Sequence, residues 1–161
     1  MKKILAVLLA TSSVAVFADT FQDFNNNLYA QYGLLSNLET NSQTNGFGIG
    51  GTFQSKNNVW VNANFGSYNA VNGDATGSMF GLKAGYAFQF FGNDSNGFQV
   101  IPYVTYTYGT TMTNLNQYYG LGVKPEYRLL DSLKVSLDIT AYDATQDGNT
   151  VAGYIATPTT T

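Results

Sequence analysis

The sequence predicts an all-β protein, an eight-stranded antiparallel up-and-down transmembrane β-barrel. Apolar and polar residues alternate along eight segments, and the connections between these segments alternate in length. Aromatic residues gather at the segment ends, whereas aliphatic residues occupy the middles. A period of two is typical of a strand with one apolar and one polar face. No stretch of the mature chain has a convincing helical pattern, so any membrane crossing is expected to use strands.

Composition excludes several classes of function. The chain has 161 residues, enough for one domain, and it contains no histidine and no cysteine. The missing residue types remove the usual acid–base side chain, thiol nucleophiles and the common structural zinc sites. The acidic balance argues against nucleic acid as a partner, because phosphate binding needs clustered basic residues. We therefore expect no enzyme activity, with no catalytic, cofactor-binding or metal site.

The N-terminus has the pattern of a cleaved signal peptide, residues 1–18. Lys2 and Lys3 precede the apolar run Ile4–Ala10, and small residues occupy the end of the segment up to Ala18. Seven apolar residues are too few to cross a hydrocarbon layer of ~30 Å as a helix. We expect residues 19–161 to form the barrel domain. In that part of the chain, five Lys and Arg residues stand against ten Asp and Glu residues.

Eight alternating segments give the expected strands. They span 28–35, 45–54, 58–67, 77–90, 97–108, 117–129, 132–142 and 150–157. Counting along the chain, the first, third, fifth and seventh connections are longer than those between them, or nearly so. A meander with long loops at one end and tight turns at the other is typical of transmembrane barrels. A Greek-key sandwich has no reason to alternate in this way.

The apolar face is expected to point outward into lipid. Aliphatic and small residues such as Val61, Leu82, Leu121 and Leu137 lie in the middles of the segments. Rings lie nearer the ends, as at Phe53, Phe88, Phe90, Phe98 and Tyr127 on one side and Tyr32, Phe47, Tyr106, Tyr108 and Tyr119 on the other. Two aromatic girdles around an aliphatic belt match the two interfaces of a membrane.

The polar face is expected to line a narrow lumen. It is rich in glycine, and it carries four of the five basic residues of the mature chain, together with Gln89 and Trp60. Glycine is poorly tolerated on a solvent-facing strand, whereas a narrow barrel uses it to make room for larger neighbours.

Six charged residues of this polar face are expected to form a cluster in the lumen. They are Lys83, Lys124, Glu126, Arg128, Lys134 and Asp138. A turn centred near Asp131 sets Lys124 opposite Asp138 and Arg128 opposite Lys134, with Glu126 diagonal to Lys134. Cross-strand neighbours on one face lie ~5 Å apart, close enough for ion pairs. Lys83 can reach the cluster only across the lumen. Both a structural plug and an ion-conducting gate are compatible with this arrangement.

The stretch "YYGLGVKPEYRLLDSLKVSLDITAYD", residues 118–143, resembles the small outer-membrane barrels of Gram-negative bacteria. This group includes the N-terminal domain of outer membrane protein A, outer membrane protein X and the opacity proteins. The resemblance implies an eight-stranded barrel in the cell outer membrane. It also implies an inward Glu-x-Arg pairing, which maps onto Glu126 and Arg128.

The expected function is a structural or surface-interaction role in the outer membrane, with room for a minor channel activity and a lumen plugged by the charged cluster. The expected partners are outer-membrane lipid, the barrel-assembly machinery, periplasmic chaperones, and a host or surface ligand at the extracellular loops. No nucleic acid is expected, and the protein should be a monomer. The alternative is an exported soluble β-barrel, either a lipocalin-like carrier with apolar residues inward or a fibre subunit.

Overall fold

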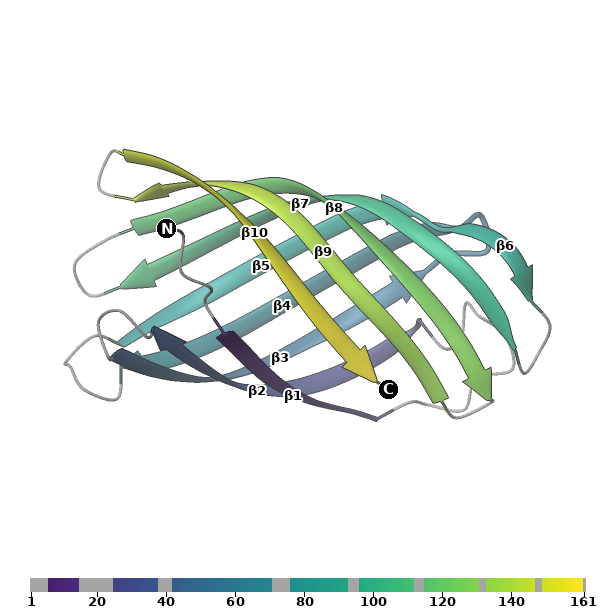
Figure 1. Cartoon of the computed structure of the whole chain (residues 1–161), viewed down its shortest axis with the longest axis horizontal. Coiled ribbons are helices and arrows are strands. Elements are labelled where there is room, and N and C mark those ends of the chain that lie inside the picture. Colours follow the sequence, from purple (N-terminus) through teal and green to yellow (C-terminus); the bar gives the residue numbers. More distant parts are fainter. Residues whose placement is uncertain are drawn as a thin grey trace.

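The structure is a computed structural model, and it describes residues 6–14, 25–37, 42–70, 76–92, 96–111, 115–130, 133–146 and 149–160. These residues form one antiparallel sheet of ten strands, with no helix among them (Figure 1). Within the described ranges, no helix is long and apolar enough to cross a membrane. The all-β, up-and-down prediction is confirmed.

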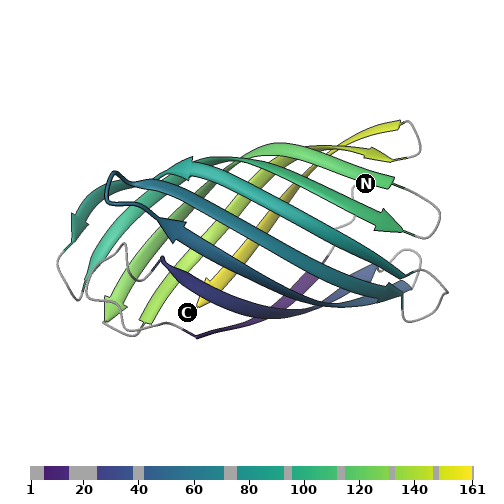
Figure 2. The ribbon, with the colours of Figure 1, turned by 180° about the vertical axis from the view of Figure 1, so that it is seen from behind.

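The strands follow one another around the sheet in sequence order, except that β6 pairs only with β7. Figures 1 and 2 show strongly tilted strands that roll the sheet into a cylinder. The strands are β1 (Ala6–Val14), β2 (Asn27–Asn37), β3 (Ser42–Gln54), β4 (Val59–Ala70), β5 (Thr76–Tyr86), β6 (Phe88–Gly92), β7 (Gly97–Thr111), β8 (Leu115–Leu130), β9 (Leu133–Gln146) and β10 (Asn149–Thr160).

The sheet has two strands more than the eight predicted. Residues 6–14, which fall in the expected signal peptide, form β1 and pair with β2 from Ala6 opposite Ser36 to Val14 opposite Leu28. The expected strand 77–90 is interrupted at Ala87, which separates β5 from β6. The backbone N–H of Ala87 still donates to the carbonyl of Asn58, 2.8 Å away, which is the next position in the register of β5 with β4. The other expected strands are present with longer ends.

The expected alternation of long and short connections is wrong, because the strands extend into segments that the sequence had suggested were loops. At one end of the sheet, hereafter the turn end, the connections are 55–58, 93–96 and 131–132. At the opposite end, the loop end, they are 38–41, 71–75, 112–114 and 147–148. Thr and Tyr at the strand ends continue the pairing, since side chains of this kind fit a half-exposed strand when a neighbour is available.

The sheet of the whole chain is not closed. β1 and β10 are the outer strands of the path, and some of their Cα atoms lie within 8 Å of one another. No ladder joins them in the part of the chain that the structure describes. Counting along the path β1-β2-β3-β4-β5-β7-β8-β9-β10, nine strands alternate in direction, so β1 and β10 run the same way.

Burial alternates with a strict period of two along β7. Ile101, Tyr103, Thr105 and Thr107 are buried, and the residues between them, from Pro102 to Tyr108, are exposed. The exposed positions of the neighbouring strands carry large apolar side chains and form one outward face, with Leu121 67% and Ile49 55% exposed. The prediction that the apolar face points outward is confirmed.

The interior is polar, which inverts the usual arrangement of a water-soluble protein. Among the described residues, the buried hydrophobic side chains are Trp60, Ala87, Ile101 and Tyr103. The buried polar and charged side chains are more numerous: Asn25, Gln54, Asn62, Gln99, Thr105, Thr107, Glu126, Arg128, Lys134, Ser136 and Thr140. The sheet therefore encloses hydrogen-bonding groups and leaves its apolar surface outside.

Aromatic rings cluster on the outer surface at the turn end. Phe91 and Tyr127 both contact Phe98, with ring centroids 6.0 and 6.4 Å away. All five residues of β6 are exposed, so the expectation that Gln89 points inward is wrong. The ladder between β6 and β7 shifts between Gln89 and Phe91, and β6 has a neighbour on one side only. This shift lets both Phe90 and Phe91 face outward.

Gly122→Ala should destabilise the fold, because a Cβ at this position would overlap the ring of Tyr103. That ring cannot move freely, since its hydroxyl contacts Asp138 and Thr140. Overpacking of this kind costs ~1–3 kcal/mol. The measurement is the midpoint of thermal unfolding of the detergent-folded protein.

Gly51→Ala is the matched control for this substitution. Its Cβ would meet Cδ2 of Leu28 at 3.1 Å, the far end of an exposed and flexible side chain. Equal losses of stability in the two variants would contradict the packing of Tyr103 against Gly122.

Candidate functional site

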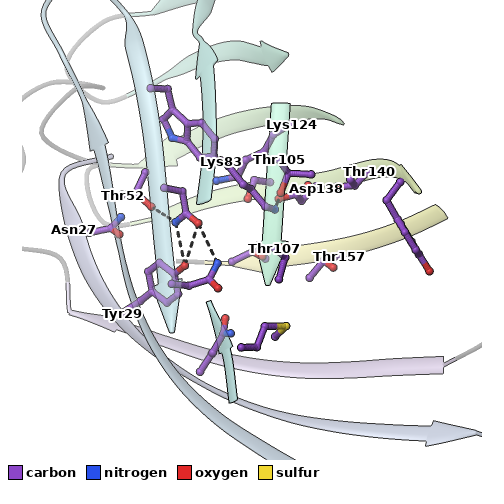
Figure 3. Close-up of a pocket in the computed structure, with 18 of the residues that line it drawn as sticks. Asn27, Tyr29, Thr52, Lys83, Thr105, Thr107, Lys124, Asp138, Thr140 and Thr157 are labelled. Carbon is purple, nitrogen blue, oxygen red and sulfur yellow. Dashed lines mark hydrogen bonds and ion pairs between the residues drawn. The ribbon is translucent and has the colours of Figure 1, made fainter. Parts of the chain in front are cut away.

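The inward side chains line a cavity of about 280 Å³ inside the rolled sheet. Strands β2 to β5 and β7 to β10 all contribute to its wall. The lining is dominated by hydroxyl, amide and charged groups: Asn27, Tyr29, Gln31, Thr52, Asn62, Asn64, Lys83, Thr105, Thr107, Tyr118, Lys124, Lys134, Ser136, Asp138, Thr140, Tyr142, Thr157 and Thr159. Figure 3 shows Lys83, Lys124 and Asp138 on one side of it and Tyr29 and Thr52 on the other.

The Glu126 carboxylate is the centre of a buried polar network, hereafter the floor, near the turn end of the cavity. Its Oε1 lies 2.7 Å from Nζ of Lys124 and 3.4 Å from Nζ of Lys134. Its Oε2 accepts hydrogen bonds from Gln99 Nε2 at 2.6 Å and from Asn25 Nδ2 at 3.0 Å. Glu126 is fully buried. A buried carboxylate is tolerated when cations and hydrogen-bond donors surround it in this way.

Carboxamide side chains complete the floor. Asn25 donates from Nδ2 to Gln54 Oε1 at 2.5 Å, and its Oδ1 accepts from Lys134 Nζ at 2.6 Å. The carboxamides of Gln54 and Gln99 pair with one another at 3.2 Å. These residues come from β3, β7 and β9 and from the residue pair that precedes β2. The floor therefore connects strands on different sides of the cylinder.

Trp60 lies in the inward phase, as the sequence indicates, and it is 1% exposed. Its ring is 5.8 Å from the ring of Tyr103, centroid to centroid, and Nζ of Lys124 lies 5.2 Å from its centroid. An ammonium over an indole face is an attractive arrangement, particularly away from water. The contact gives the inward tryptophan a favourable partner inside the rolled sheet.

A second group of charged and polar side chains crosses the lumen between β5 and β9. Lys83 Nζ lies 2.5 Å from Oδ2 of Asp138 and 4.9 Å from the ring centroid of Tyr103. The hydroxyl of Tyr103 donates to Oδ1 of Asp138, and it lies 2.5 Å from Oγ1 of Thr140. Lys83 and Asp138 are the more accessible pair, with side chains 24% and 16% exposed. They face the cavity, whereas Glu126 is sealed beneath it.

Two smaller contacts hold the wall, one at the height of Lys83, which is opposite Asn62, and one nearer the loop end. Asn62 donates to the hydroxyl of Tyr29 at 3.0 Å and to Oγ1 of Thr52 at 3.0 Å, which ties β4 to β2 and β3 (Figure 3). Tyr118 on β8 contacts Sδ of Met79 at 2.8 Å. Polar contacts thus extend along the length of the cavity.

The sequence predicted the register of β8 and β9 correctly. Arg128 lies opposite Lys134 and Val123 opposite Ile139, as a turn near Asp131 requires. The expected pairing of Lys124 with Asp138 is wrong: Lys124 turns along its own strand to Glu126, and Asp138 is taken by Lys83 from across the lumen. Register fixes which Cα atoms are opposed, but long side chains choose among several partners.

Glu126 and Lys134 are brought together as expected, although Lys124 lies closer to the carboxylate. Arg128 is fully buried two residues further along β8. Within the described residues it forms no ion pair with Glu126, so the pairing implied by the family resemblance is not observed.

The sequence reading did not predict that Asn25, Gln54, Gln99 and Tyr103 take part in the charge network. Gln54, Gln99 and Tyr103 are in the inward phase, and a long polar side chain in that phase is a signal that could have identified them. Asn25 precedes the first strand of the expected barrel, and no periodicity reaches it.

The charges described above lie in a compensated polar network. No group of three or more His, Cys, Asp or Glu residues that could hold a metal ion occurs among the described residues. Both inward carboxylates are engaged with lysines. Such a network stabilises and seals the interior, because each buried charge depends on its partners remaining in place.

No family model matches the chain, and neither the curated proteins nor the solved structures yield a match.

Glu126→Gln should lower the midpoint of thermal unfolding of the detergent-folded protein. The substitution keeps the shape of the side chain but removes the charge that Lys124 and Lys134 share. Breaking a buried ion pair costs ~3–5 kcal/mol, and water in the cavity reduces this figure. Asp143→Asn, at an exposed position on β9, is the control and should change little. If the Glu126→Gln variant and the parent protein unfold at the same temperature, the charge of this carboxylate does not contribute to the stability of the fold.

Proposed function

We propose that the chain is an exported β-barrel of a bacterial outer membrane with a structural or surface-interaction role. The observation that carries the proposal is the exposed apolar surface of the sheet. Leu28, Phe47, Phe65, Phe90 and Val104 are each more than half exposed. An apolar patch much larger than a few hundred Å² marks a surface that another apolar phase covers. A surface that extends around the cylinder fits lipid better than it fits a single protein partner.

The interior supports the same proposal. A strand that crosses a bilayer must satisfy every backbone polar group within the sheet, and its alternate side chains then face lipid and lumen. Here the outward positions carry the apolar side chains, and the inward positions carry the lysines, glutamines and threonines. A carrier of apolar ligands would need few polar groups in its cavity, whereas 18 of the 20 side chains that line this one carry a hydroxyl, amide or charged group beside the carbon atoms that they expose.

Strand direction supports an eight-stranded barrel in the mature chain. With β1 present, the two outer strands run the same way, so an antiparallel ladder cannot close the sheet. Without β1, the outer strands are β2 and β10, which run in opposite directions. Removal of residues 1–18 would therefore free the edge of β2 for antiparallel pairing with β10. An even number of strands is what a closed up-and-down meander requires, and closure leaves no unpaired edge in the membrane.

Closure predicts a change in hydrogen exchange of β10. In the chain 1–161, β10 pairs with β9 alone, so alternate backbone amides of Asn149–Thr160 should exchange quickly. In the chain 19–161 folded in detergent micelles, these amides should become protected because they then bond to β2. The amides of β8, which has a neighbour on each side, serve as the control and should be slow in both chains. Persistent fast exchange of alternate β10 amides in the shorter chain would contradict closure.

The floor closes the turn end of the lumen in this structure, which supports a plugged barrel with a surface-interaction or structural role as its main activity. Five of the six predicted lumen charges are divided between the floor and the Lys83–Asp138 pair, and the sixth, Arg128, is buried two residues from Glu126. Outer-membrane lipid is the proposed partner of the belt. The proposal places the loop end outside the cell and the turn end in the periplasm.

Cysteine labelling in lipid vesicles tests the membrane proposal. The chain has no cysteine of its own, so each introduced thiol is unique. Val135→Cys, at an outward position of β9 that is 40% exposed, should react with a lipid-soluble thiol probe. Ser136→Cys, the next residue and 4% exposed, should not react with that probe. Equal labelling of the two positions, or labelling at position 136 alone, would contradict the membrane proposal.

A further inference from the structure

Asn25 occupies an unusual place in the interior. It precedes β2, which begins at Asn27, yet its side chain is fully buried between the walls of the cylinder. Its carboxamide contacts residues of three strands: Gln54 on β3, Glu126 on β8 and Lys134 on β9. A single side chain from outside the barrel strands therefore spans the turn end of the lumen.

Asn25 differs from the other members of the floor in the way its backbone is held. Gln54, Gln99, Glu126 and Lys134 lie on strands whose backbone ladders fix them in the wall. Asn25 and Asn26 lie outside any ladder. They are held in the described structure by side-chain contacts, including a hydrogen bond from the backbone N–H of Gln54 to Oδ1 of Asn26 at 2.7 Å. Asn25 can leave the floor without the loss of a strand pairing.

The cavity continues directly from the floor. Lys124 and Lys134 contact Glu126 in the floor and also line the cavity, and Ser136 lies between the floor and the Lys83–Asp138 pair along β9. Above the floor, polar groups line the cavity toward the loop end. The carboxamide of Asn25 thus lies at the boundary between this hydrophilic interior and the turn end.

We propose that Asn25 is a removable stopper, which closes the turn end of the interior cavity and on withdrawal opens a hydrophilic path for water and small hydrated ions. When Asn25 leaves, Glu126 keeps Lys124, Lys134 and Gln99 as partners, so the carboxylate stays compensated while the opening forms. Conduction between two compartments rests on the proposed membrane barrel, whereas the closing of the cavity does not.

The test uses the chain 19–161 with Ser136→Cys as a reporter of access to the interior. The rate of reaction with a small, charged, water-soluble methanethiosulfonate is measured in detergent, and ion current is measured in planar bilayers. Asn25→Ala should raise the reaction rate several-fold and should increase the current. Asn25→Ser, a smaller polar residue that disturbs folding less, should act in the same direction. Heat-modifiable gel mobility identifies the folded protein in every case.

Asn26→Ala is the matched control, because it removes an identical side chain that accepts a hydrogen bond from the backbone N–H of Gln54 and is not bonded to the side chains of the floor. It should leave both the rate and the current at the level of the parent protein. Unchanged thiol reactivity in folded Asn25→Ala and Asn25→Ser overturns the stopper, and so does an equal increase in Asn26→Ala. A protein that fails to enter lipid contradicts the membrane proposal instead, while the rates in detergent still decide the role of Asn25.

Discussion

The burial of one carboxylate, that of Glu126, organises the interior of this protein. A buried charge must be matched by partners, and here two lysines and two carboxamides surround it within hydrogen-bonding distance or close to it. The partners come from β7, β8 and β9 and from the residues before β2, so the requirement of a single group brings distant parts of the chain together. Gln54 and Trp60 then pack against these partners and complete the floor.

The polar interior and the apolar exterior are two results of one backbone arrangement. Each strand offers alternate side chains to opposite faces, so a sequence that alternates polar and apolar residues puts lysines and glutamines in the lumen and leucines and phenylalanines on the outside. The glycines of the inward phase make room for large neighbours, as Gly122 does for Tyr103. The hydroxyl of Tyr103 can then reach Asp138 and Thr140, which links packing to the electrostatics of the lumen.

The alternation of residues along a strand predicted which face a side chain is on. It failed where contacts with other strands decide the partner or the orientation of the side chain. Counting residues gives the two faces of the long strands. It also gives the inward position of Trp60 and the register of Arg128 with Lys134. The partner of Lys124 does not, because a long side chain can turn along its strand to Glu126 as readily as across to Asp138. The outward turn of Gln89 depends on a ladder shift with β7 that no alternation shows. Asn25 lies before the periodic part of the chain, so only the folded interior reveals its position.

The ion pair between Lys83 and Asp138 also has a mechanical consequence. β5 and β9 are separated by two other strands along the sheet, so the pair is a chord across the cylinder. A chord of fixed length resists widening of the rolled sheet along its own direction, since widening would draw the ammonium away from the carboxylate. We expect the resistance of the sheet to such widening to be greatest at the height of this pair.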